Sequence, residues 1–93
     1  MEDEEHIEAL MKRSPVKTLN AFLRDIEIHA EIAVGHTPRS GREQALTDIK
    51  KNIDIIRRYG GKDCDQYIEI GGVLEEHSIN PMDVGYIHPK RHR

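Results

Sequence analysis

Residues 14–35 read SPVKTLNAFLRDIEIHAEIAVG, and their apolar positions follow the period of an α-helix. The residues that recur at alternating spacings of three and four are Val16, Leu19, Leu23, Ile26, Ala30 and Ala33. Such a repeat places them on one side of a helix as a buried stripe, with Phe22 at its edge. Ser14-Pro15 suits the N-terminus of this helix, and Gly35 suits its C-terminus because glycine tolerates a left-handed backbone. The stretch therefore predicts one long helix.

The same helix carries a second, narrower apolar strip. At about 100° per residue, Ala21, Ile28 and Ile32 fall well away from the main stripe. The helix thus has more apolar surface than one intramolecular contact uses, and this favours self-association. We expect the strip to be an interface in a homo-oligomer. The alternative is that it belongs to the intramolecular core.

A second long helix is predicted after a loop at residues 35–41. It begins at Thr37 or Ser40 and ends at Gly60-Gly61. Its buried stripe consists of Ala45, Leu46, Ile49, Ile53 and Ile56. The short loop favours an antiparallel helical hairpin.

Shorter elements complete the chain on both sides of the hairpin. Residues 2–12 have the pattern of a short helix, and Asn80-Pro81 begins one last turn. Asp63 can cap a further helix, in which one side is formed by Cys64, Tyr67, Ile68, Gly71 and Leu74. Residues 67–70 alternate like a strand, so residues 64–77 are either helical, which we favour, or partly strand. Gly71-Gly72 interrupts this helix or lets another segment approach it closely.

These patterns predict an all-α fold, a helical hairpin or small bundle of four to five short helices. With 93 residues the chain is expected to form one helical domain, residues 1–87, followed by a flexible basic tail, residues 88–93. The net charge of −3 argues against nonspecific nucleic-acid binding by the whole surface. The charge is uneven, because acidic residues crowd the first positions and basic residues the last ones.

The composition also limits the location of the protein and the chemistry expected of it. The single cysteine, Cys64, excludes an internal disulfide framework. No apolar run approaches the roughly 20 residues that cross a bilayer, and the acidic start is unlike a signal peptide. We expect a soluble, cytoplasmic protein with no membrane contact. The six histidines show no paired ligand spacing, so neither a metal site nor another cofactor is expected.

Residues 24–29, RDIEIH, have the Arg-x4-His form and resemble the motif of HEPN ribonucleases, which are all-helical and usually dimeric. The resemblance implies that Arg24 holds the scissile phosphate and that His29 assists attack by the 2′-hydroxyl group. The motif lies in the first long helix rather than late in the bundle, where the family has it. The alternative interpretation, which we favour, is that Arg24 is a solvated residue and His29 flanks the core stripe.

Residues 40–47, SGREQALT, resemble the start of the second hairpin helix in phage anti-CBASS proteins, small helical oligomers that sequester cyclic oligonucleotides. The resemblance implies a sponge for such signals. Ser40, Arg42 and Lys50 are then candidate phosphate contacts, because a helix N-terminus favours anions. Helix capping and solubility explain the same residues.

The tail offers one more candidate site, because Lys90, Arg91 and Arg93 can neutralise phosphates and Tyr86 can stack on a base. Solubility, or contact with the acidic N-terminus of another subunit, explains the tail equally well.

No catalytic constellation stands out in this sequence. The function that we expect is therefore a small non-catalytic binding protein, an adaptor, regulator or inhibitor of another protein, that works as a homo-oligomer. The HEPN-like ribonuclease and the phage-type sponge are the alternatives.

Overall fold

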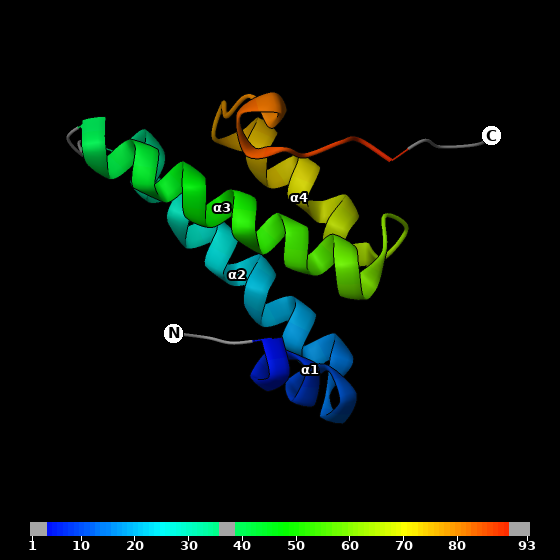
Figure 1. The fold of residues 1–93 in the computed structure, drawn as a ribbon. Helices are drawn as coiled ribbons and strands as arrows, with labels where there is room; N and C mark the ends of the chain where they lie inside the picture. The colour runs from blue at the N-terminus through cyan, green and yellow to red at the C-terminus, as the bar shows by residue number, and fades with distance from the viewer. Residues whose placement is uncertain (1–3, 36–38, 90–93) are drawn as a thin grey trace.

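The computed structural model describes residues 4–35 and 39–89, and these ranges are helical with no strand (Figure 1). The elements are α1 (Glu4–Arg13), α2 (Pro15–Val34), α3 (Arg39–Gly60), α4 (Asp65–Glu76) and a short 3₁₀ helix, η1 (Pro81–Val84). The predicted all-α class is confirmed, and residues 67–70 are helical. No helix in the described ranges has the length and apolarity needed to span a membrane.

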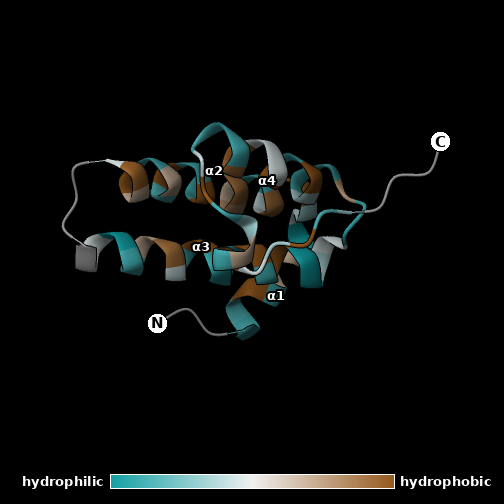
Figure 2. Ribbon diagram, turned by 90° about the horizontal axis from the view of Figure 1, so that it is seen from above, coloured by the Kyte–Doolittle hydropathy of each residue, from teal (hydrophilic) through white to brown (hydrophobic). Residues whose placement is uncertain are grey.

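The α2–α3 hairpin is the frame of the molecule. The two helices run antiparallel, α4 packs on both of them, and α1 turns back beside the start of α2 (Figure 1). Hydrophobic and hydrophilic residues alternate along both hairpin helices, as amphipathic helices require (Figure 2). The residues that are fully buried in the core are Ile26, Ile49, Ile53, Ile56, Tyr67, Ile70, Leu74 and Val84.

The α1–α2 junction forms as a break in helical backbone rather than as a side-chain cap. Pro15 occupies the first turn of α2, but the Ser14 side chain makes no capping hydrogen bond. The Ser14 amide instead donates to the Leu10 carbonyl at 2.9 Å, and the Ser14 carbonyl accepts from the Thr18 amide at 2.9 Å. The predicted side-chain cap is therefore wrong, although the helix begins where the proline places it.

The loop side of the hairpin also differs from the prediction. Gly35 follows α2 in extended backbone (φ −81°, ψ −158°), so it ends the helix without a left-handed conformation. Helix α3 begins at Arg39, which makes Ser40 part of the helix and not its cap. Thr37 lies outside the described residues. At the other end of α3 the expected left-handed glycine is present, because Gly61 has φ +85° and its amide donates to the Arg57 carbonyl at 2.9 Å.

The predicted stripes are mostly correct, with errors at their edges. Val16 is 62% exposed, although Thr18 in the same turn and Leu19 after it are buried. In α4 the buried stripe includes Ile70, whereas Ile68 is only half-buried. The N-cap of α4 is Cys64 rather than Asp63, and its Sγ atom accepts from the Tyr67 amide at 3.3 Å.

Helix α1 is held to the hairpin by apolar and ionic contacts. Ile7 and Met11 are buried against the core. The Arg58 guanidinium donates to Glu4 at 2.8 Å and to Asp54 at 3.2 Å. The hydrogen bond that Arg58 donates to Glu4 and the charge of Asp54 raise the pKa of Arg58. Only the Arg58–Glu4 pair links α1 to α3, and because it is exposed it contributes little stability.

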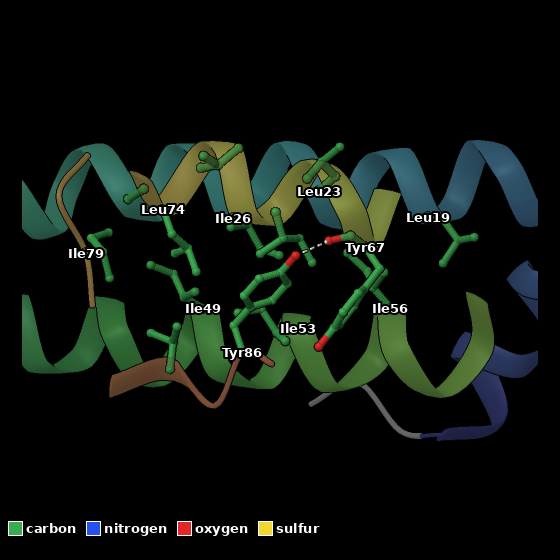
Figure 3. Packing of buried hydrophobic residues seen from close by; sticks show 14 of the residues in the cluster. Leu19, Leu23, Ile26, Ile49, Ile53, Ile56, Tyr67, Leu74, Ile79 and Tyr86 are labelled. Atoms are coloured by element: carbon green, nitrogen blue, oxygen red, sulfur yellow. Dashed lines mark hydrogen bonds between the residues drawn. The ribbon is translucent and has the colours of Figure 1, made fainter. Parts of the chain in front are cut away.

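Two tyrosines anchor the segment after η1 to α4 (Figure 3). The Tyr86 hydroxyl donates to the Tyr67 carbonyl at 3.0 Å, and the two ring centroids lie 4.8 Å apart. The Tyr67 hydroxyl donates to the Ile87 carbonyl at 2.9 Å and accepts from the Ile87 amide at 3.2 Å. Tyr86 is only 4% exposed, so the expectation that it stacks on a nucleotide base is wrong. It is a core residue.

The two glycines of α4 provide a matched stability test. A Cβ atom at Gly72 would meet nothing within 4 Å, whereas one at Gly71 would lie 3.0 Å from the Tyr86 hydroxyl oxygen. We expect Gly72→Ala to raise the free energy of unfolding by about 1 kcal/mol, because alanine favours helix. Gly71→Ala should lose that gain, because it must displace a buried ring. Urea unfolding checks both, and equal gains would contradict the close approach of Tyr86.

Candidate interaction surface

The outer face of α2 combines three predicted interface residues on the side away from the core. Ala21 is exposed, and the Ile28 and Ile32 side chains are 50% and 41% exposed. Ile26, two positions before Ile28, is fully buried, which fixes the rotation of the helix. We name the surface formed by Ala21, Ile28 and Ile32 the outer strip.

A groove continues the outer strip toward α1. It has a volume of about 370 Å³ and lies between α1 and the first half of α2. Its apolar side chains are Leu10, Ala21 and Phe22, so Ala21 belongs to both the groove and the outer strip. Other large apolar side chains are exposed singly, such as Val16 on α2 and Met82 in η1, and single exposure is normal. The outer strip differs from these isolated side chains because its two isoleucines share a helix face with Ala21, which also lines the groove.

Charged residues follow one flank of the outer strip in two blocks. Lys17 and Arg24 lie in the first half of α2, and Glu27 and Glu31 lie in the second half. All four are exposed. At about 100° per residue they lie on the same side of the strip. The flank is therefore basic at one end and acidic at the other.

The opposite flank holds a polar cluster that joins α2 to α3. The Asn52 amide donates to the Asp25 carboxylate at 2.6 Å. The His29 Nδ1 atom lies 2.8 Å from the Asp25 carbonyl oxygen, and its Nε2 atom lies 3.3 Å from the Asp48 carboxylate. Asp25, Asp48 and Asn52 were not among the site residues predicted from the sequence. The feature of the sequence that could have indicated this cluster is that polar residues interrupt the apolar pattern on the facing sides of the two hairpin helices.

The Arg24–His29 pair is not arranged as one site in this structure. The two residues are five positions apart on α2, which separates their directions by about 140°. Arg24 is exposed on the charged flank, whereas His29 lies on the opposite flank within the polar cluster. The imidazole is placed between two carboxylates that can orient it, but no nucleophile is among these contacts.

The candidate phosphate contacts are also spread out. Arg42 lies in a hollow of about 370 Å³ that Glu43 and Asp83 also line, so negative charge surrounds it. Lys50 is two turns further along α3, about 12 Å away along the helix axis. The Ser40 side chain and the tail residues Lys90, Arg91 and Arg93 lie outside what the structure describes.

Comparisons with protein-family models, with curated proteins and with solved structures found no match. Among the described residues, no group of three or more His, Cys, Asp or Glu side chains is placed to hold a metal ion. The geometry of this chain is therefore what carries the functional inference.

Proposed function

We propose that this chain is a non-catalytic binding protein that recognises a protein partner through the outer strip and works as a homo-oligomer. The observation that carries this proposal is that two half-exposed isoleucines share one face of α2 with Ala21, at which an apolar groove begins. Such a surface fits an adaptor, a regulator or an inhibitor that acts in the cytoplasm. Ridges and grooves on helices are the elements that helix-to-helix recognition uses.

The energetics support binding through these two side chains. Complete burial of an isoleucine is worth about 1.5–3 kcal/mol relative to complete exposure. Ile28 and Ile32 retain roughly half of their exposed surface in the monomer, so each can contribute about 1 kcal/mol on binding. A binding free energy of this magnitude suits a reversible interaction whose affinity also depends on the surrounding charges.

A capture experiment with a matched control tests the proposal. The wild-type chain, Ile28→Glu and Val16→Glu are each immobilised and exposed to extract of the native host. Val16 is a suitable control because it is exposed on the same helix but lies off the outer strip. We expect Ile28→Glu to lose the bound protein and Val16→Glu to keep it. Equal recovery by both variants, together with unchanged self-association, would refute the proposal.

A cleavage assay separates binding from catalysis. We expect no cleavage of labelled single-stranded RNA or tRNA by the purified protein, because Arg24 and His29 lie on opposite flanks of α2. His29→Ala should leave this result unchanged. Cleavage that disappears in His29→Ala would instead support the HEPN-like ribonuclease. Tight binding of a cyclic oligonucleotide in calorimetry, lost in Arg42→Ala, would support the phage-type sponge.

A further inference from the structure

We propose that the partner of the outer strip is a second copy of this chain, packed antiparallel along α2 across a two-fold axis. This inference rests on the proposed function and deepens it, because it names the partner and its direction. The basis of this proposal is that, in this arrangement, the strip, the groove and the charged flank of one copy fit the same surface of the other copy. A two-fold interface brings each surface element onto the same patch of the other copy.

The apolar residues define the register of the two helices. In an antiparallel pair, placing Ala21 opposite Ile28 of the second copy also places Ile28 opposite Ala21 of the second copy. Each small side chain then meets a large one, as close packing of two helices requires. The positions near the two-fold axis are Arg24 and Asp25.

The groove receives the remaining isoleucine in the same register. Ile32 of the second copy lies opposite Lys17, beside the groove that Leu10, Ala21 and Phe22 line. The two-fold axis also brings like flanks together, and the groove lies on the flank toward which Ile32 is displaced from the strip. An exposed side chain and an apolar groove are thus paired twice in one interface.

The charged flank selects the antiparallel direction. Lys17 of one copy comes beside Glu31 of the other, and Arg24 comes beside Glu27, within about one to two residues of exact opposition at about 1.5 Å per residue. Each pair occurs twice by symmetry. In a parallel two-fold pair the charged flank of each copy instead meets the opposite flank of the other copy, so these ion pairs do not form.

Asp25 does not oppose this arrangement, although it lies near the axis. Its carboxylate accepts from Asn52 of α3 at 2.6 Å and lies 3.4 Å from the His29 imidazole. The contact with Asn52 holds the carboxylate on the α3 side of the helix, while the Asp25 side chain stays 47% exposed.

Charge reversal tests the direction of packing. The half-reversed variant carries Lys17→Glu and Arg24→Glu, and the fully reversed variant adds Glu27→Lys and Glu31→Lys. All four positions are exposed, so both variants should fold, which circular dichroism checks. We expect the half-reversed variant to dimerise at least about tenfold more weakly in sedimentation equilibrium at low salt, and the fully reversed variant to regain the wild-type affinity. A fully reversed variant that stays dissociated overturns the proposal.

Mixing distinguishes antiparallel from parallel packing. The wild type and the fully reversed variant, labelled with different fluorophores, should form only homodimers, because an antiparallel mixed pair sets like charges together. Random mixing of the two chains would mean that the charged flanks do not meet, as in parallel packing, and would overturn the proposal. A wild-type chain that stays monomeric at every concentration also overturns it. The proposed function is then judged separately, by whether the Ile28→Glu chain loses a captured protein that the Val16→Glu chain keeps.

Discussion

Ile26→Ala is expected to lower the free energy of unfolding by about 2–5 kcal/mol. Ile26 is fully buried between the hairpin helices, so the substitution removes apolar contacts and leaves a cavity. A domain of this size has a total stability of about 5–15 kcal/mol, so the loss is a large fraction of it. Urea unfolding followed by far-UV circular dichroism measures the change.

Ile28→Ala is the matched control, because it makes the same substitution two residues along the same helix. Ile28 is half-exposed, and alanine favours helix by roughly 0.5 kcal/mol, so the change should stay within about 0.5 kcal/mol in dilute, monomeric protein. Equal losses at the two positions would mean that α2 does not turn Ile26 inward and Ile28 outward.

Ile28→Glu is expected to weaken self-association at least about 100-fold, while the helical signal stays unchanged. In a two-fold dimer the substitution places two carboxylates in the apolar part of the interface, and burying an unpaired charge is costly. Ile32→Glu should act in the same direction, because in the proposed dimer it removes the side chain that meets the groove of the other copy. Light scattering coupled to size exclusion measures the mass, with circular dichroism on the same samples.

Val16→Glu serves as the control for the added charge. It should keep the wild-type mass, because Val16 is exposed and lies off the outer strip. If Ile28→Glu unfolds the chain, the strip belongs to the core, and if the variant keeps the dimer mass, the interface lies elsewhere.

The sequence predicts most of this fold because helical period and helix ends are local properties. The stripe from Leu19 to Ala33 and the left-handed Gly61 both follow from neighbouring residues. Errors occur where local signals are nearly equivalent. Asp63 and Cys64 are adjacent candidates for the same cap, and the choice of Cys64 accompanies packing of its sulfur beside Gly60.

The candidate site was only partly predictable, since part of it depends on contacts between distant residues. The outer strip could be predicted because its members lie on one helix. The polar cluster could not, because Asp25 meets Asn52 only after the hairpin closes. The groove likewise requires α1 to fold back beside α2, and Tyr86 is assigned to the core by a hydrogen bond to Tyr67.

Sedimentation equilibrium of the wild-type chain over a wide concentration range shows whether the outer strip joins two copies. We expect a mass that rises with concentration from 10.7 kDa to twice that value and no further, because a two-fold interface is closed. A mass that stays at 10.7 kDa up to high concentration would contradict it.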